Sequence, residues 1–280
     1  MTYDVLARGA LDYMPCRYGD SKLAFRGPKQ DLSLPYVAFL GGNEIYGKFI
    51  EEPIPALVGR ELQISCANFG HPNAGVDLFL KDPFMLAACS RAEMTVLQVL
   101  GAGNMSNRMY TVHPRRNDRF VAPSETLRRL FPDVDFAEFH YTGHLLNHLS
   151  KTGGDRFAPV LAELEEAWVR RMHSLMEQIE SKVVLLWMSD RPIARARLRG
   201  SAMDLDHHPL FINREMMERV VPLSHQLVEV VVSEAAIQAG TDGMIFSELD
   251  ALAASRMFGP KAHREAAQAV APVLERGLLK

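Results

Sequence analysis

Five short apolar runs, separated by longer segments with helical spacing, are the feature of this sequence that most limits its fold. The runs span residues 36–40, 63–68, 94–100, 183–188 and 227–232. Most of them are continuously apolar rather than alternating, which is typical of parallel strands covered on both faces. Strands that alternate with helices favour right-handed crossovers within one sheet. The sequence therefore predicts an α/β protein with a three-layer α/β/α arrangement and a five-stranded parallel sheet.

The longest helix is predicted over about residues 155–181, where apolar side chains recur at helical spacing on one face. Asp155 is expected to cap its N-terminus. Shorter helices are predicted at residues 55–62, 83–91, 123–131, 135–149, 213–224 and 261–276. Since no repeat or linker interrupts the chain, residues 1–280 are predicted to form a single domain, with an extended lead-in at 1–34 and a large insertion at 101–154.

Composition and charge exclude several classes of protein. Hydrophobic residues make up 48% of the 280 residues and charged residues 23%, as in ordinary globular proteins. The net charge of −3 gives no reason to expect nucleic acid or an anionic membrane as a partner. No apolar run approaches the roughly 20 residues that span a bilayer, and the N-terminus lacks the apolar core of a signal peptide. We expect a soluble, cytoplasmic protein with reduced cysteines and no cofactor or metal.

A glycine turn follows the first apolar run. Gly41 and Gly42 lead into Asn43 and Glu44, and a helix-like segment comes next. Open α/β sheets build ligand sites from such a strand, turn and helix at the carboxyl end of the strand, and glycine lets other groups approach the backbone closely. The turn therefore predicts a small-molecule site at this edge of the sheet. The alternative is an ordinary strand-to-helix turn, which glycine also marks.

With five strands and this turn in order, the chain resembles the SGNH (GDSL-like) hydrolase superfamily. Its members have a flavodoxin-like three-layer fold and act mainly as esterases, lipases, acetyl-hydrolases and acyltransferases. Their first block, Gly-Asp-Ser-x-x-x-Gly, follows strand one and carries the nucleophilic serine. Residues 41–47 read Gly-Gly-Asn-Glu-Ile-Tyr-Gly, so the spacing to the last glycine is kept. Asn43, however, stands at the serine position, and Gly42 stands at the aspartate position.

The next two blocks of the superfamily follow strands two and three. The second block, Asn-x-Gly, supplies an oxyanion-hole amide and resembles Asn68-Phe-Gly70, with Gly75 as a rival donor. The third block, Gly-x-Asn-Asp, resembles Gly-Ala-Gly-Asn104. Either the asparagine of this block has become glycine, or the loop has shifted by one residue so that Asn104 takes its role.

The last block, Asp-x-x-His before the final helix, meets Pro-Lys-Ala-His263, so the histidine is kept and the aspartate is proline. The resemblance implies that His263 acts as a general base on water, because the unperturbed pKa of histidine lies near neutrality. Glu44 or Asp250 would replace the missing carboxylate that orients it. The alternatives are a solvent-facing His263 in the first turn of the helix, and a capping role for Asn43 in the turn that follows it.

An asparagine cannot be activated as a nucleophile, so the resemblance implies altered chemistry. The backbone N–H of Asn43, that of Gly70 or Gly75, and the side chain of Asn104 are expected to converge on a developing oxyanion. Our first hypothesis is weak or non-serine acyl hydrolysis or transfer on a small acylated or anionic ligand such as a sugar derivative. The alternative is a pseudoenzyme that binds a small molecule or a partner in the same pocket. A homo-oligomer is compatible with both.

The insertion carries a polar run, residues 104–119, that is rich in arginine. Its candidate ligand-binding residues are Asn104, Asn107, Arg108, His113, Arg115 and Arg116. Guanidinium groups match the geometry of carboxylate, sulfate and phosphate, so the arginines of this run, which extend to Arg119, could clamp an anion. A solvated loop or a subunit contact is the alternative. The segment 113–119 and the Gly-Gly-x-Glu turn also resemble a family of uncharacterised proteins from marine and soil alphaproteobacteria.

Three further patterns are weaker. A literal Gly-Asp-Ser21 occurs in the lead-in, but no buried strand precedes it to present the serine. His140, His144 and His148 fall on one face of a predicted helix, yet three such ligands span about 12 Å, too far to share one ion. A polar stripe is the better interpretation. Residues 206–208, Asp-His-His, form at most a weak ligand group in a loop.

Overall fold

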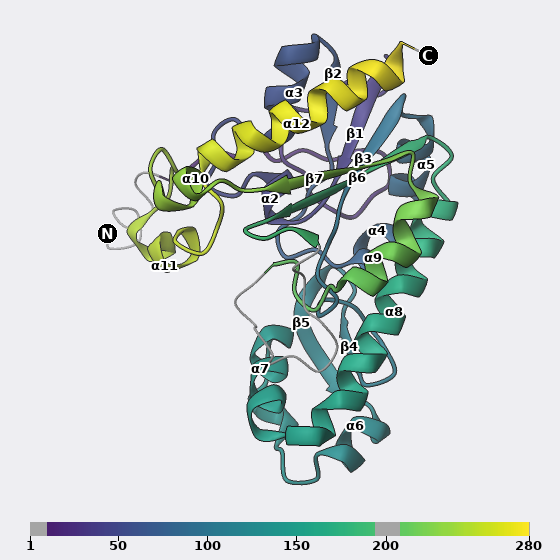
Figure 1. Ribbon diagram of the computed structural model, residues 1–280, viewed down its shortest axis with the longest axis vertical. Helices are drawn as coiled ribbons and strands as arrows, with labels where there is room; N and C mark the ends of the chain where they lie inside the picture. The colour runs from purple at the N-terminus through teal and green to yellow at the C-terminus, as the bar shows by residue number, and fades with distance from the viewer. Residues whose placement is uncertain (1–9, 194–207, 280) are drawn as a thin grey trace.

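The computed structural model of the protein describes residues 10–193 and 208–279. Its centre is a parallel sheet of five strands in the order β2-β1-β3-β6-β7 (Figure 1). The strands are β1 (Tyr36–Leu40), β2 (Ser65–Asn68), β3 (Met94–Gln98), β6 (Lys182–Ser189) and β7 (Gln226–Val231). All five predicted strands are therefore confirmed. Counted along the sheet-forming strands, the order 2-1-3-4-5 is that of flavodoxin-like folds, a group wider than the SGNH hydrolases.

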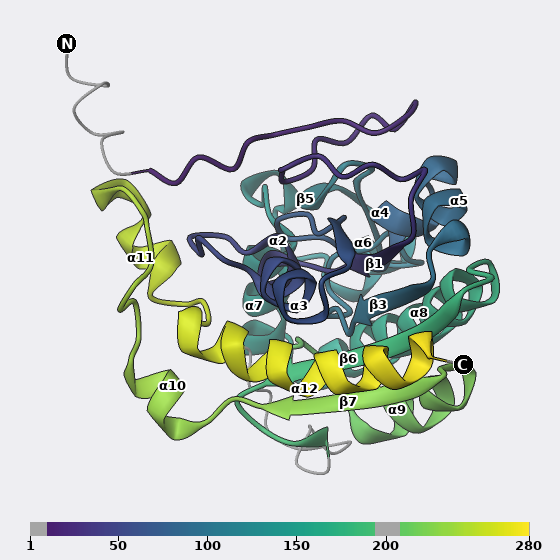
Figure 2. The ribbon, with the colours of Figure 1, turned by 90° about the horizontal axis from the view of Figure 1, so that it is seen from above.

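Helices cover both faces of the sheet, which confirms the three-layer α/β/α arrangement. On one face α3 (Ile54–Leu62) packs along α12 (Pro260–Leu278), as Figure 2 shows from above. Val37 and Phe39 of β1 are buried beneath these helices. The helices of the other face are α4 (Val76–Leu80), α5 (Pro83–Arg91), α8 (Ala158–Glu177) and α9 (Arg214–Val220). Because every residue of β1 and β3 is buried, neither strand shows the alternation of a sheet with one face in solvent.

The longest helix starts later than the sequence predicts. Residues 154–157 form a 3₁₀ turn, and α8 begins only at Ala158. Asp155 lies exposed within that turn, so it does not cap the helix as expected. The N-cap position belongs to Phe157, which makes no side-chain capping bond.

The helix predicted over residues 135–149 is interrupted. A 3₁₀ turn covers Phe136–Glu138, and α7 covers Thr142–Thr152. Asp135 caps the 3₁₀ turn through its side chain. Tyr141 is extended and forms a β-bridge with Arg119. This pairing to a distant segment, which helical spacing does not reveal, breaks the helix in two.

The insertion after β3 extends away from the sheet at one end of the molecule (Figure 1). It contains the antiparallel pair β4 (Tyr110–His113) and β5 (Arg116–Pro123), followed by α6 (Glu125–Leu130) and α7. Two buried carboxylates tie it to the helical layer. Glu163 of α8 pairs with Arg108, and Asp77 of α4 accepts a hydrogen bond from Ser106 N at 3.2 Å.

The lead-in, described from residue 10 to 34, packs against the turns at one side of the sheet. Its buried Tyr18 and Phe25 rings each form a T-shaped contact with the Phe69 ring. Arg26 is 5% exposed and donates hydrogen bonds to three backbone carbonyls that follow the glycine turn. The lead-in therefore holds the segment that leaves β1.

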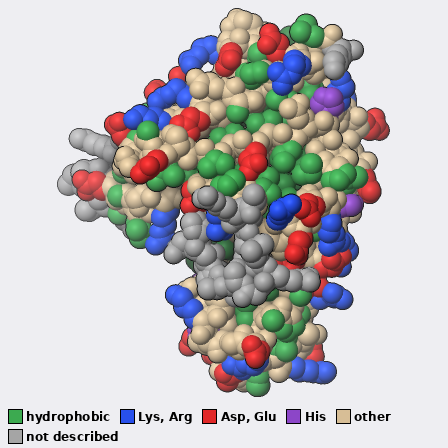
Figure 3. Space-filling model, viewed as in Figure 1, with side chains coloured by type: hydrophobic (Ala, Val, Ile, Leu, Met, Phe, Trp, Pro, Cys, Tyr) green, Lys and Arg blue, Asp and Glu red, His purple; other side chains and the backbone are tan. Residues whose placement is uncertain are grey.

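The chain returns from β7 to α12 through α10 (Glu234–Gln238) and α11 (Ala251–Ala254), which lie to one side of the sheet (Figure 1). On the face drawn in Figure 3, charged side chains of both signs surround a central group of hydrophobic side chains. In the described part of the chain, no helix combines the length and the apolar composition that crossing a bilayer requires.

Candidate functional site

A cavity of about 530 Å³ lies where β1 and β3 end. These strands are neighbours in the sheet, but the chain leads from β1 to one side and from β3 to the other. Such a topological switch point is where open α/β sheets bind ligands. The cavity is lined by residues from both strand ends, the loop after β2, the end of β6, the insertion, and the segments before α9 and before α12. Those with polar side chains are Asn43, Glu44, Asn73, Gln98, Asn104, Asp118, Tyr141, Thr142, His208 and Arg256.

Gln98, the last residue of β3, organises one wall of the cavity. Its side-chain oxygen accepts a hydrogen bond from Gly42 N at 2.8 Å, and its nitrogen donates to Glu44 Oε2 at 2.7 Å. A Cβ on Gly41 would overlap the Gln98 side chain, so this position requires glycine. Because Gln98 is only 6% exposed, it holds the Glu44 carboxylate in a fixed place.

Asn43 starts the short helix α2 (Asn43–Tyr46) but does not cap it. The N-cap is Gly42, without a side-chain bond. Asn43 Nδ2 instead donates to Asn73 Oδ1 at 3.1 Å, and Asn73 Nδ2 donates to Asp118 Oδ2 at 3.3 Å. Asn73 has a φ of 55°, a left-handed conformation that asparagine tolerates better than most residues. This chain of polar groups joins the turn after β1 to the insertion.

Asn104 ties the loop after β3 to two other segments. Its Nδ2 donates to Asn73 O at 3.0 Å, and its Oδ1 accepts from Thr142 Oγ1 at 2.6 Å. The amide oxygen and one N–H are thus engaged within the protein, which fixes the orientation of the side chain in the cavity wall.

The N–H groups of the two glycines expected to contribute to an oxyanion hole are engaged elsewhere. Gly70 N donates to Asn68 Oδ1 at 2.9 Å, and Asn68 Nδ2 donates to Ile45 O at 2.8 Å. Gly75 N donates to Asn117 Oδ1 at 3.1 Å. Asn68, Gly70 and Gly75 do not line the cavity. Their hydrogen bonds shape the loop after β2 and leave neither glycine N–H free for an oxyanion.

His263 lies in neither of its two expected positions, which were the ligand site and the solvent-facing side of the helix. Its side chain is 2% exposed, so it does not face solvent, and it does not line the cavity. Burial, and then the positive charge of Arg26, lower the pKa of His263 to about 3, so the ring is a weak base at neutral pH. Neither expected carboxylate orients it, because Glu44 is held at the cavity and Asp250 accepts a hydrogen bond from Ser247.

The arginines of the insertion do not converge into a clamp. Arg108 Nε donates to the buried carboxylate of α8 at 2.6 Å. Arg119 lies over the ring of Tyr141, with 4.1 Å between the guanidinium carbon and the ring centre. Arg115 and Arg116 are exposed at the turn between β4 and β5. None of the four arginines lines the cavity.

The side chains of Asn107 and His113 form hydrogen bonds within their own loop. Asn107 Oδ1 accepts hydrogen bonds from Met109 N and Tyr110 N, at 2.8 and 3.1 Å. His113 Nδ1 accepts from Arg115 N at 3.3 Å. Neither side chain lines the cavity, so both stabilise local backbone instead of meeting a ligand there.

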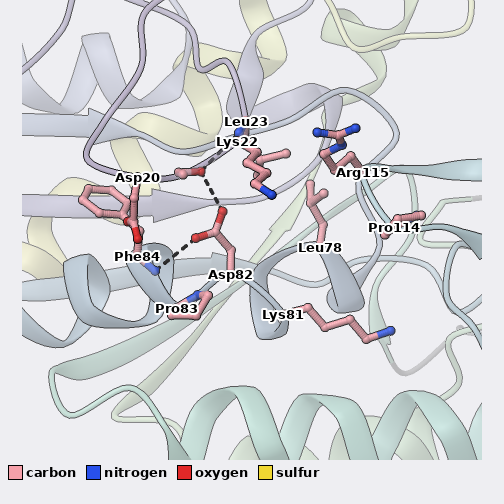
Figure 4. Close-up of a pocket in the computed structure, with 11 residues that line it drawn as sticks. Asp20, Lys22, Leu23, Leu78, Lys81, Asp82, Pro83, Phe84, Pro114 and Arg115 are labelled. Carbon is pink, nitrogen blue, oxygen red and sulfur yellow. Dashed lines mark hydrogen bonds between the residues drawn. The ribbon is translucent and has the colours of Figure 1, made fainter.

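Ser21 lies in a separate groove of about 330 Å³, which Figure 4 shows from close by. Its hydroxyl donates to Asp82 Oδ2 at 2.6 Å and accepts from Leu23 N at 3.2 Å. The other oxygen of Asp82 caps α5. No histidine lines this groove, so the serine lacks the imidazole base of a catalytic triad, and its bonds stabilise the lead-in.

The histidines of the insertion pack against an aromatic ring. His144 and His148 lie 4.8 and 5.2 Å from the same phenylalanine, between ring centres. Among the described residues, no three His, Cys, Asp or Glu side chains are placed to hold a metal ion. Of the loop group at 206–208, the first two residues lie outside the described residues. His208 is exposed and lines the cavity.

The predicted site residues that the structure brings together in the cavity are Gly42, Asn43, Glu44 and Asn104. Sequence reasoning missed several of their neighbours. Gln98 could have been found from the sequence, because it is a polar residue near the end of an apolar run, at the edge of the sheet where ligands bind. Asp118 lies in the arginine-rich run but carries no signal of its own. Thr142 and Arg256 come from segments whose approach to the turn depends on how the connections fold. His208 belongs to the loop group at 206–208, which the sequence indicated only as a weak ligand group.

Three comparisons with known proteins bear on this chain. The crystal structure of a lipase, Lip_vut3 from a goat rumen metagenome, is similar over 85% of this chain and 96% of that chain, with 11% sequence identity and a TM-score of 0.46. The comparison with curated proteins gave no significant match. The model of a family described as a domain of unknown function, DUF6473, matches residues 1–278. The chain therefore belongs to the DUF6473 family.

Proposed function

We propose that this protein binds a small molecule rich in hydroxyl groups, such as a sugar derivative, in the cavity between the ends of β1 and β3. We also propose that it does not hydrolyse esters through a covalent intermediate. The observation that carries the proposal is the connected set of fixed amides and carboxylates on the cavity wall. Their place at the switch point of the sheet supports a binding role.

The chemistry of the wall suits a hydroxylated ligand. Amide side chains donate and accept hydrogen bonds, and carboxylates accept them. A hydroxyl group can pair with either, because it both donates and accepts. Because Asn43, Gln98 and Asn104 are already held by bonds within the protein, little side-chain entropy is lost when a ligand binds. A cavity of about 530 Å³ is also of the size that small-molecule sites have.

Three features argue against the ester hydrolysis that the resemblance implies. Asn43 offers no group that a base could activate. The N–H groups of Gly70 and Gly75 are used within their own loop, although preorganised donors are usually the largest catalytic term. His263 is buried outside the cavity and its pKa is lowered to about 3. The nucleophile is thus absent, the two glycine donors of the oxyanion hole are occupied, and the histidine is a weak base away from the cavity.

A variant that fills the cavity tests binding. Gly143 lines the cavity near the start of α7, and a Cβ there meets no atom within 4 Å. Gly143→Leu should therefore fold, since leucine favours helices more than glycine does, and it adds a large side chain at the wall of the cavity. The matched control is Lys151→Leu, which changes an exposed residue in the last turn of the same helix.

The probes are D-glucose, N-acetyl-D-glucosamine, D-glucosamine and D-glucuronate, with binding measured by calorimetry. We expect wild type and Lys151→Leu to bind at least one of these sugars, and Gly143→Leu to bind none. Binding that survives in Gly143→Leu, or the failure of wild type to bind any of the four, would contradict the proposal.

The catalytic part of the proposal has its own test. We expect p-nitrophenyl acetate to be hydrolysed no faster by wild type or by Asn43→Ser than by buffer alone. Turnover gained in Asn43→Ser would instead indicate a hydrolase site that lost only its nucleophile. Wild-type turnover abolished by His263→Ala would indicate a working enzyme that does not use serine.

A further inference from the structure

Two carboxylates, Glu44 and Asp118, line the cavity without a cationic partner. Glu44 Oε2 accepts a hydrogen bond from Gln98, and Asp118 Oδ2 accepts one from Asn73. Both of these partners are neutral amides. Among the described residues, no Lys, Arg or His forms an ion pair with either acid. One oxygen of each carboxylate therefore remains for a ligand.

Two acids whose side chains are almost fully buried, Asp77 and Glu163, have cationic partners. Asp77 pairs with Lys81 at 2.7 Å and with Arg171 at 2.5 Å. Glu163 pairs with Arg108 at 2.5 Å. Such pairing is expected, because removing a charge from water is unfavourable unless an opposite charge compensates it. Glu44 and Asp118, which are part-buried on the wall of the cavity, have no such partner at the place where a ligand is proposed to enter.

The uncompensated charges favour one kind of ligand. Like charges in a concave site walled by protein raise the local concentration of the opposite charge. A protonated amine has three donors and no acceptor, so it matches carboxylate oxygens that lack a donor. A hydroxyl group brings no charge, and an anionic group would be repelled. Arg256 also lines the cavity, but its side chain is exposed and pairs with neither acid.

We propose that the ligand carries a protonated amine that binds Glu44, while Asp118 adds attraction from the other end of the polar chain. Glu44 is the better-defined partner, because Gln98 is nearly fully buried and fixed by Gly42 N. The bond between Asp118 and Asn73 is longer, at 3.3 Å. This inference rests on the proposed function, since it names the charge of the ligand for the same cavity.

Three sugars that share one ring and differ in charge test the inference. D-glucosamine, D-glucose and D-glucuronate are titrated into wild type by calorimetry, at a pH where the amine is protonated. We expect glucosamine to bind about ten- to a hundredfold more tightly than glucose, which is the range that one hydrogen bond to a charged group supplies. Glucuronate should bind most weakly of the three.

The isosteric variant Glu44→Gln removes the charge and keeps the shape. We expect it to lose the preference for glucosamine over glucose, whereas the matched control Glu215→Gln, an exposed position in α9, keeps the preference. Thermal unfolding of both variants shows whether they are folded.

The outcomes separate this inference from the proposed function. If glucose or glucuronate binds as tightly as glucosamine, the proposal that the ligand carries an amine is wrong, and the proposed binding function stands. If glucosamine is preferred equally by wild type and Glu44→Gln, the assignment to Glu44 is wrong. If none of the three sugars binds, the inference falls. If N-acetyl-D-glucosamine also fails to bind, the proposed function falls with it.

Discussion

The turn after β1 carries the first block of the resemblance to SGNH hydrolases, and the first turn of α12 carries the last. Their environments in the structure are opposite. Asn43 and Glu44 are part-exposed on the wall of a cavity. His263 is 2% exposed, and its Nδ1 has no hydrogen-bond partner in the described structure. One block therefore faces the space where a ligand can enter, and the other has become part of the core. The position of a motif along the chain does not settle which of the two happens.

The reason lies in what directs each side chain. A turn that follows a buried parallel strand emerges at the edge of the sheet, so residues placed there reach the switch point. The direction of a helical side chain depends on which face of the helix is apolar. His263 falls at helical spacing with Ala267, Val270 and Leu274, all of which are buried. The histidine therefore shares the face that α12 turns toward the core.

Arg26 connects the two regions and should give the largest effect on stability. Its guanidinium donates to the carbonyls of Tyr46, Gly47 and Glu51, and its charge acts on the buried histidine of α12. Arg26→Ala would leave buried carbonyls without donors, at a loss of about 3–5 kcal/mol in the free energy of unfolding. Urea denaturation measures this loss.

The control for Arg26→Ala is Arg129→Ala, which removes an exposed ion pair within α6. It should change the free energy of unfolding by no more than about 0.5 kcal/mol. If the two variants lose the same stability, Arg26 does not hold the segment after β1 in the way that its contacts indicate.

His263 should make the fold sensitive to acid. Its pKa is about 3 in the folded protein and 6.5 as the reference value, so the unfolded chain binds a proton that the folded protein excludes. Stability is therefore complete above about pH 6.5 and is lost as the pH falls toward about 3, with a loss near 2 kcal/mol at about pH 5.

His263→Leu removes this titration and keeps an apolar side chain in the core. We expect its free energy of unfolding to fall less between neutral pH and pH 5 than that of wild type, by about 2 kcal/mol. Denaturation curves at both pH values give the comparison. Equal pH dependence in the two proteins would mean that His263 is hydrated or paired in solution.

A substitution at Gln98 tests how the bonds of the cavity wall contribute to stability. Gln98→Met keeps the length of the side chain but removes the acceptor of Gly42 N and the donor to Glu44. Leaving these groups unpaired should lower the free energy of unfolding by about 1–3 kcal/mol. Gln238→Met, which breaks an exposed bond within α10, is the control and should have little effect. A neutral Gln98→Met would mean that water replaces the lost bonds.

Much of the fold can be predicted from the sequence because the relevant signals are local. The run from Tyr36 to Leu40 is apolar since both of its faces are covered, and five such runs suffice to define a parallel sheet. The break at Tyr141 could not be predicted, because its cause is a bridge to Arg119 in another strand. Local spacing carries no information about such long-range pairing.

The same limit applies to the site. Asn43 and Glu44 can be assigned to it because a glycine turn directly follows a buried strand. The engagement of the Gly75 amide cannot be foreseen, since its acceptor is Asn117, 42 residues away. The place of Asp118 on the cavity wall depends on how the insertion folds back. The burial of His263 could have been inferred from its spacing with the apolar residues of α12, a signal that the resemblance to a catalytic block outweighs.

Asn43 should have the smallest effect on stability, although it stands at the position that the resemblance makes most important. Its side-chain bonds to Asn73 are exposed, so Asn43→Ala should change the free energy of unfolding by less than about 0.5 kcal/mol. Under the proposed function it still meets the ligand, and its loss should weaken sugar binding about fivefold, as expected for one neutral hydrogen bond. His263→Leu should leave that binding unchanged, because the histidine does not line the cavity. Calorimetry on the two variants therefore tests whether only the turn after β1 contributes to binding. If His263→Leu weakens binding as much as Asn43→Ala does, the buried histidine acts on the site after all.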